Sequence, residues 1–204
     1  KNEGNKYIKM SADLGDVESM HRYGLMLDIG DEIEEDKQKA AYYFKMAADK
    51  GNEKSILSYA YLMDTCAQSQ EDKEESIKYY KLAIKKGNPV AMFNLASLYR
   101  DGDGIPQNKM EAARYFKMAA DIGDTDSMYE YAFIMDKGDG ITSNKQEALI
   151  YYKMAADQGD IDAMKNIALM LEKGEGIPEN KQEAAFYYKM AADQGEGYSM
   201  YKYA

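Results

Sequence analysis

Glycine recurs every 36 residues along this chain, and no insertion or deletion shifts the phase. Each of these glycines closes a similar segment, such as KMAADKG or KMAADQG. The six positions are Gly15, Gly51, Gly87, Gly123, Gly159 and Gly195. A fixed period of this length is typical of a solenoid, in which one supersecondary unit stacks on the next. We therefore expect the 204 residues to form one elongated domain rather than a globule with a single central core.

Each copy is predicted to be a helical hairpin. In the last copy, aromatic residues stand eight and seven positions before the glycine, and alanines stand four and three before it. These residues are Tyr187, Tyr188, Ala191 and Ala192. Such offsets place all of them on one side of a helix of about 14 residues. Because glycine reaches positive φ without a Cβ clash, the chain is expected to turn at the glycine that follows this first helix.

A second helix is predicted after each glycine. Asn88 can cap this helix in the third copy, and Pro89 suits its first turn. The apolar stripe of the fifth copy consists of Ala163, Met164, Ile167, Ala168 and Leu171. Its small residues would let two helices approach closely. The segment 174–178, Gly-Glu-Gly-Ile-Pro, would end the helix, because two glycines and a proline do not continue it.

The repeated pattern is Ala-x-x-Tyr/Trp-Tyr-x-x-Ala-Ala-x-x-Gly, then small-x-x-x-Leu-Gly/Ala, then Gly-x-Gly-Val/Ile-Pro. It resembles the Sel-one-like repeat (SLR) family, a branch of the tetratricopeptide-like helical solenoids, and the match is strongest in residues 108–123 and 144–195. The resemblance implies an all-α fold, a right-handed α/α superhelical solenoid of helix-turn-helix repeats. It also implies a non-catalytic scaffold or adaptor that binds a protein or peptide.

In this register the copies are residues 1–36, 37–72, 73–108, 109–144, 145–180 and an incomplete 181–204. Solenoids normally close with a polar-faced terminal repeat, whereas this chain stops on Tyr198, Met200, Tyr201 and Tyr203. We therefore expect a piece of a longer protein whose uncapped ends are candidates for self-association. In the second copy, residues 64–70 replace the double-glycine turn. Either that turn is wound differently or the second helix runs longer.

Charge and cysteine content exclude several classes of partner and setting. Lysine plus arginine total 26 against 36 acidic residues, and the net charge of -10 opposes binding to nucleic acid. No apolar run approaches the roughly 20 residues of a membrane helix, so membrane insertion is not expected. Cys66 is the only cysteine, and Asn-x-Ser/Thr sequons are absent. These features favour an intracellular location.

Positions that vary between copies are free to encode recognition, and three of them share one flank of the first helix. They lie twelve, nine and five residues before the glycine. The resemblance implies that first helices line the concave side. We therefore predict a partner-binding ladder on this flank, with no catalytic residue, metal or cofactor. The ladder consists of Lys39, Tyr42, Met46, Lys78, Leu82, Glu111, Arg114, Met118, Ile150, Met154, Phe186 and Met190.

Packing is the alternative interpretation for the ladder, and it is favoured for each methionine, since methionine fills gaps between repeats. For Tyr42, Ile150 and Phe186 the two interpretations are balanced. An aspartate recurs two residues before the glycine, where the helix dipole disfavours it. We expect a lysine or a backbone amide of the neighbouring repeat to compensate it. These aspartates are Asp13, Asp49, Asp121, Asp157 and Asp193.

Other chemical signals have simpler explanations. His21 is the only histidine and has no companion for a zinc site. Cys66 lacks a base in its own repeat. Residues 101–104, Asp-Gly-Asp-Gly, lack the remaining carboxylates of a calcium loop. The acidic run 31–36 is interpreted as a solvated loop rather than a cation site or a dock for a basic peptide.

Two further functions stay open. The chain could be a regulatory or oligomerising module of a larger enzyme. Some cysteine-rich relatives of the fold are credited with binding or cleaving β-lactams, but those carry disulfide pairs in their repeats, and this chain has one cysteine. A hydrolase of the β-lactamase type is therefore the less favoured alternative.

Overall fold

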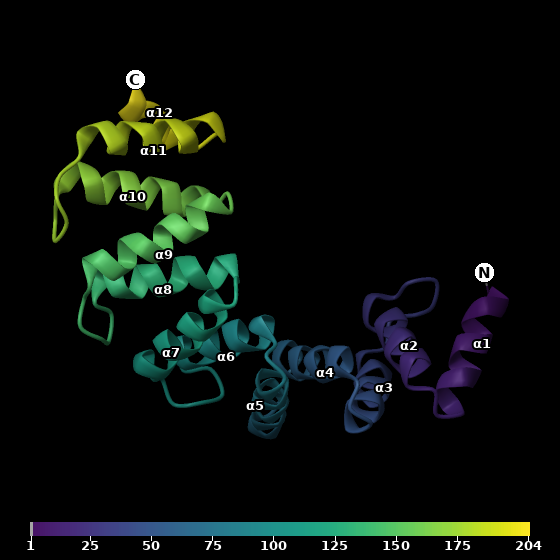
Figure 1. The fold of residues 1–204 in the computed structure, drawn as a ribbon. Helices are drawn as coiled ribbons and strands as arrows, with labels where there is room; N and C mark the ends of the chain where they lie inside the picture. Colours follow the sequence, from purple (N-terminus) through teal and green to yellow (C-terminus); the bar gives the residue numbers. More distant parts are fainter. Residues whose placement is uncertain (1) are drawn as a thin grey trace. The chain divides into compact units, whose positions relative to one another are not determined.

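The computed structural model describes residues 2–204 of the chain, and that range holds twelve α-helices and no strand. The predicted all-α solenoid of helix-turn-helix repeats is confirmed, because the helices alternate with short turns and pack on their neighbours in sequence (Figure 1). The helices are α1 (Asn2–Asp13), α2 (Val17–Ile29), α3 (Lys37–Asp49), α4 (Glu53–Thr65), α5 (Gln70–Lys85), α6 (Pro89–Asp101), α7 (Lys109–Asp121), α8 (Thr125–Lys137), α9 (Lys145–Asp157), α10 (Ile161–Lys173), α11 (Lys181–Asp193) and α12 (Gly197–Tyr203).

The chain divides into two compact units, residues 1–91 and residues 92–204, and the division falls within α6. In the first unit α2 packs on α1 and α3, and α4 packs on α3 and α5. In the second unit α8 packs on α7 and α9, and α10 packs on α9 and α11. Each of these second helices therefore contacts the first helix of its own hairpin and that of the next. One continuous domain over residues 1–204 stays a prediction.

The repeated glycines have the predicted conformation. The φ angle of Gly51 is 89° and that of Gly123 is 104°, in the left-handed region that favours glycine. A Cβ added at either position would have no atom within 4 Å, so the backbone and not the available space requires glycine. The second helices then start from capped positions: Asn52 accepts a hydrogen bond from the backbone N–H of Ser55, and Asp124 accepts one from Ser127.

The core runs through the hairpins, on the stripes that the period predicts. Phe44 and Tyr80 are fully buried in the first unit, and Phe116 and Tyr152 are fully buried in the second. Glycine and alanine on the facing helices allow close approach. A Cβ added at Gly24 in α2 would lie 2.7 Å from the ring of Phe44.

The irregular turn of the second copy is wound differently, and the second helix is not longer. Helix α4 ends at Thr65, the same repeat position at which the other second helices end. Helix α5 begins earlier than the other first helices: it starts at Gln70, whereas α3 and α7 start at the position that corresponds to Lys73. Ser69 caps α5, and its hydroxyl and the carboxylate of Asp72 form a capping box. A longer first helix therefore replaces the double-glycine turn.

The lysine at the start of a repeat binds the last turn of the second helix of the preceding repeat. Lys145 donates to the carbonyl oxygen and to the carboxylate of Asp136, both at 2.7 Å, and Lys37 makes the same two contacts to Asp28. A cation at a helix C-terminus is favourable because the last carbonyls carry partial negative charge. Burial alone would raise the pKa of Asp136, but Lys137 and Lys145 hold that pKa below its usual value.

Candidate protein-binding surfaces

The ninth residue before the repeated glycine is exposed in every copy. Tyr42, Ile150 and Phe186 are 57–60% exposed, and Lys78 and Arg114 are also exposed. Arg114 lies over the ring of Tyr115, with its guanidinium carbon 4.1 Å from the ring centroid. Within each unit, this part of the ladder therefore presents large side chains on the outside of the first helices.

One turn further along, the ladder is half-buried. Met154 and Met190 pack against the buried core of the second unit, as the packing interpretation expects. Met118 is half-buried and its sulfur lies 3.4 Å from an N–H group of Arg114, while Met46 is half-buried and Leu82 is exposed at the matching position. These side chains pack, and they also present one side to solvent.

The row twelve residues before the glycine already has partners within the protein. Lys39 pairs with Asp36 at 2.6 Å, and Glu111 pairs with Arg114 at 2.7 Å. At the same position Glu183 accepts from Lys153 of the preceding repeat at 2.7 Å. The sequence interpretation assigned this row to recognition, whereas the structure shows that it also holds neighbouring repeats together. The whole ladder stays a prediction as a binding surface.

The lysine six residues before each glycine is the main feature that the sequence interpretation missed. In the second unit Lys117 lies 5.3 Å from the ring centroid of Tyr131 and 4.7 Å from that of Tyr151. In the first unit Lys45 lies 5.3 Å from the ring centroid of Tyr59. The lysine thus covers aromatic rings between two repeats, which is a cation–π arrangement. Its presence in all six copies was the available signal.

The compensation of the repeated aspartates differs from the prediction. A tyrosine hydroxyl of the next repeat donates to the carboxylate: Tyr79 to Asp49 at 2.9 Å and Tyr151 to Asp121 at 2.5 Å. The expected lysine or amide of the neighbouring repeat was wrong, because the eighth residue before the glycine is a tyrosine whose hydroxyl reaches the preceding helix end. Lysines do pair with Asp13 and Asp121, but these are Lys9 and Lys117, four residues earlier in the same helix. Burial and the bond to Asp49 raise the pKa of Tyr79 to about 12, so at neutral pH this hydroxyl is a donor.

A second surface with recognition features lies on the second helices of the second unit. Tyr129 and Phe133 stack with ring centroids 6.3 Å apart, and Phe133 is 37% exposed. Arg100 of α6 pairs with Glu130 at 3.0 Å across neighbouring repeats. These four side chains line a hollow of about 360 Å³ together with Ile134 and Asp139. We call this hollow and its rim the second-helix face.

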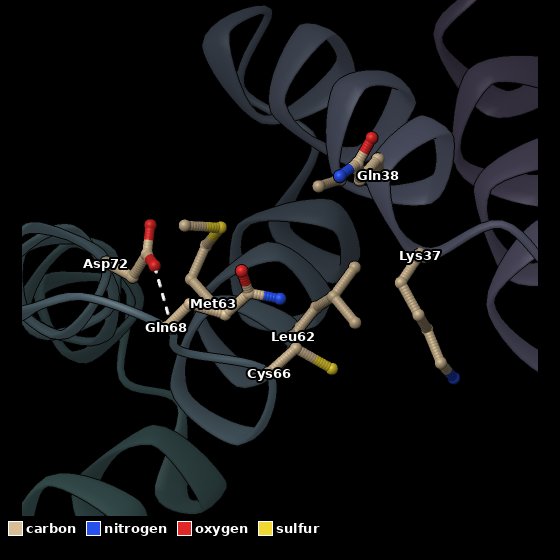
Figure 2. Close-up of a pocket in the computed structure, with 8 residues that line it drawn as sticks. Lys37, Gln38, Leu62, Met63, Cys66, Gln68 and Asp72 are labelled. Atoms are coloured by element: carbon tan, nitrogen blue, oxygen red, sulfur yellow. Dashed lines mark hydrogen bonds between the residues drawn. The ribbon is translucent and has the colours of Figure 1, made fainter.

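The exposed Cys66 lines a different pocket, of about 230 Å³, in the first unit (Figure 2). The polar groups around its thiol form hydrogen bonds with other residues of the protein. Asp72 accepts from the backbone N–H of Gln68, as the dashed line in Figure 2 shows, and Lys37 is bound to Asp28. The imidazole of His21 is buried and lies 2.9 Å from the hydroxyl of Ser55. The only histidine is thus engaged with Ser55.

Two results concern other classes of site. Among residues 2–204, no group of three or more His, Cys, Asp or Glu side chains could hold a metal ion. Across the same described range, no helix has the length and apolar character needed to cross a membrane.

The family model of the Sel1 repeat matches the chain five times, over residues 17–52, 56–88, 89–124, 125–160 and 161–196. The chain belongs to the Sel1 repeat family. Proteins of this family generally mediate protein–protein interactions and are typically non-enzymatic scaffolds. No curated protein sequence matches the chain.

Solved Sel1 structures show the same fold. The c5321 protein, a protective antigen of uropathogenic Escherichia coli with an SLR fold, is 24% identical at a TM-score of 0.86. That match covers 100% of this chain, which spans 44% of the length of c5321. A Sel1 repeat protein from Oxalobacter formigenes is 23% identical at a TM-score of 0.75, covering 98% of this chain and 87% of that one. At these identities the likeness shows the fold alone.

The matched segments change the phase in which the repeat is counted. Each begins at or within a helix of the second kind, α2, α4, α6, α8 or α10, and ends after the next helix of the first kind. The resemblance implies that the first helix of a repeat lines the concave side. In the phase of the Sel1 repeat, the first helix of each repeat is α2, α4, α6, α8 or α10, and these helices do not carry the ladder. The resemblance therefore gives no support to a concave position for the ladder.

Proposed function

We propose that this Sel1 repeat chain is a non-catalytic interaction module that holds a segment of a partner protein on the second-helix face. The observation that carries the proposal is the hollow beside Phe133. It combines exposed aromatic surface with charged side chains on neighbouring repeats. Binding energy in protein interfaces concentrates in such places, where an anchor side chain fills a pocket within a polar rim.

The size and charge of the hollow suggest the chemistry of the occupant. A volume of about 360 Å³ suits a few side chains of a bound segment better than a dinucleotide or a large cofactor. Glu130 and Asp139 line the hollow together with Arg100, and they are paired with Arg100 and Lys109, whereas the chain as a whole carries a net charge of -10. We therefore infer a segment with an apolar anchor flanked by lysine or arginine, which long-range attraction would also steer to the protein.

The ladder remains the alternative surface for the same function, and the two surfaces offer a matched pair of variants. Phe133 and Phe186 are exposed phenylalanines of the second unit, one on each surface. Peptides would be selected from a displayed random library with the wild-type chain. Their affinities would then be measured by fluorescence anisotropy for the wild type, Phe133→Glu and Phe186→Glu.

The expected result is a loss of about 30-fold or more for Phe133→Glu, which is the cost of removing a hot-spot anchor of about 2 kcal/mol. Phe186→Glu should bind like the wild type, and basic residues should be enriched among the selected peptides. The reverse pattern would move the site to the ladder. Equal binding by all three proteins would reject both surfaces, provided circular dichroism shows each variant to be folded.

Self-association through the ends of the chain stays a separate prediction.

A further inference from the structure

At two joints between consecutive repeats, a lysine covers the ring of a tyrosine. Lys45 lies 5.3 Å from the ring centroid of Tyr59, and Lys117 lies 5.3 Å from that of Tyr131. The first helix of the next repeat supplies a glutamate that holds the lysine, as Glu75 does by pairing with Lys45. Such a joint therefore combines a cation–π contact with an ion pair on the same ammonium group.

The joint between the first and second copies lacks this arrangement, because lysine replaces the glutamate. Lys39 stands at the position of the glutamate, and Lys9 pairs with Asp13 of its own helix at 2.6 Å. Within the described range 2–204, no lysine or arginine lies over the ring of Tyr23, the tyrosine of this joint. This ring is therefore available to a cation from another molecule.

A hollow of about 380 Å³ includes this ring in its lining. Tyr23, Leu27 and Ile33 form its apolar wall, and they come from α2 and from the loop that joins α2 to α3 (Figure 1). The whole lining lies within residues 9–39, so the hollow is an internal feature of the first unit. An apolar wall with a few convergent polar groups is typical of a binding pocket.

The charged part of the lining has an acidic excess. Glu34, Glu35 and Asp36 line the hollow together with the ammonium groups of Lys9 and Lys39. Both lysines are already bound to aspartates, Lys39 to Asp36 at 2.6 Å. Glu34 is exposed and, among the described residues, forms no hydrogen bond or ion pair. Its carboxylate can therefore pair with a cation that enters the hollow.

We propose that this hollow binds a lysine or arginine side chain of a partner protein. The charged group would lie over the ring of Tyr23 and pair with Glu34, and the methylene groups would pack on Leu27 and Ile33. Charge complementarity decides the class of occupant. Residues 31–36 contain five acidic side chains and no basic one, so the loop attracts a basic segment and repels an acidic one.

This site revises the interpretation of the acidic run 31–36 as a solvated loop. The side chain of Ile33 is half-buried and lines the hollow, so the loop forms part of a pocket wall. The site belongs to the first unit, whereas the second-helix face belongs to the second unit. The proposal therefore does not depend on the proposed function of that face.

Two peptides test the proposal on the 204-residue chain, in titrations followed by amide chemical shifts of the isotope-labelled protein. The first is Gly-Ser-Leu-Arg-Leu-Ser-Gly, and the second carries citrulline, an uncharged isostere, in place of arginine. The wild type should bind the arginine peptide about tenfold more tightly than the citrulline peptide. Shifts should be confined to the lining of the hollow and its neighbours.

Variants of the acidic loop provide a matched pair. Glu34→Gln should weaken binding of the arginine peptide about fivefold and leave the citrulline peptide unchanged. Asp31→Asn removes one charge from the same loop but outside the lining, so its affinity should stay within about twofold of the wild type. Circular dichroism would show that each variant is folded.

Lys39→Glu separates the site from general attraction by an acidic protein. The new carboxylate corresponds to Glu75 at the next joint, so Lys9 should move over the ring of Tyr23 and exclude the arginine of the peptide. Binding should weaken about tenfold even though the protein becomes more negative. Tighter binding by this variant would overturn the proposal.

Phe133→Glu distinguishes this hollow from the second-helix face and should bind the arginine peptide like the wild type. A loss in that variant would place the peptide on the second-helix face and would overturn the present proposal alone. Equal affinities for the two peptides, equal losses in Asp31→Asn and Glu34→Gln, or a wild type that binds neither peptide would overturn it as well.

Discussion

The bond between Tyr79 and Asp49 makes a quantitative prediction for Tyr79→Phe. The substitution keeps the buried ring and its edge contact with Tyr59 but removes the hydroxyl that donates to Asp49 at 2.9 Å. Hydrogen bonds to charged groups contribute about 1.5–3 kcal/mol. Asp49 is exposed, so water replaces the lost donor and the cost falls toward the lower limit. We expect the free energy of unfolding to decrease by about 1–1.5 kcal/mol.

Urea unfolding followed by far-UV circular dichroism measures this change. With a slope of about 2 kcal/mol per molar urea, the midpoint should fall by about 0.5 M. Tyr115→Phe is the matched control, because Lys85 and not aspartate stands at the corresponding place in the preceding repeat. That control should stay within about 0.5 kcal/mol of the wild type. An equal effect of the two substitutions, or no effect of Tyr79→Phe, would refute the assignment of the tyrosine–aspartate bond as a stabilising joint.

Two further predictions concern the pH dependence of stability and the replacement of glycine by alanine. Burial lowers the pKa of His21 below 6.5, so the unfolded chain binds the proton more tightly than the folded chain does. The free energy of unfolding should therefore fall as pH drops from about 6.5 toward 5. The urea midpoint of His21→Gln should lack this decrease. The pKa of Asp13 is also lowered, mainly by Lys9 and then by Tyr43, but that stabilisation is lost only below about pH 4. Gly123→Ala should cost about 1–2 kcal/mol through its positive φ, and Gly24→Ala about 1–3 kcal/mol through the contact with Phe44. Thermal melts followed by circular dichroism measure these changes. Gly4→Ala has open space in a helix and should be neutral or stabilising in the same melts; destabilisation equal to that of Gly24→Ala would contradict the packing argument.

The sequence predicted the hairpins, their glycine turns and the buried stripes, because a fixed period repeats the same local requirements. Gly123 needs positive φ whatever surrounds it, and Phe116 lies on the apolar side of its helix whichever neighbour covers it. The contacts between repeats were harder to foresee. Tyr151 looks like an ordinary core residue in sequence, and only the packed helices show that its hydroxyl reaches Asp121.

The candidate site was predicted less well than the fold, and the reason is geometric. Periodicity identifies which side of a helix is exposed, but it does not tell which helices of a solenoid form a hollow. In the sequence, the large variable residues Ile150 and Phe186 indicated a binding surface on the first helices, and both side chains are exposed. The half-exposed Phe133 beside Tyr129 gave no comparable signal, because a hollow partly buries the residues that line it.

Photo-crosslinking tests the proposed role of the second-helix face most directly. A photoreactive phenylalanine analogue would replace Phe133 in one protein and Phe186 in another, and each would be irradiated with a library-selected peptide. We predict a covalent adduct from position 133 that excess unlabelled peptide competes away, and none from position 186. Adducts from position 186 alone would contradict the account, and so would a complete lack of competed adducts at both positions.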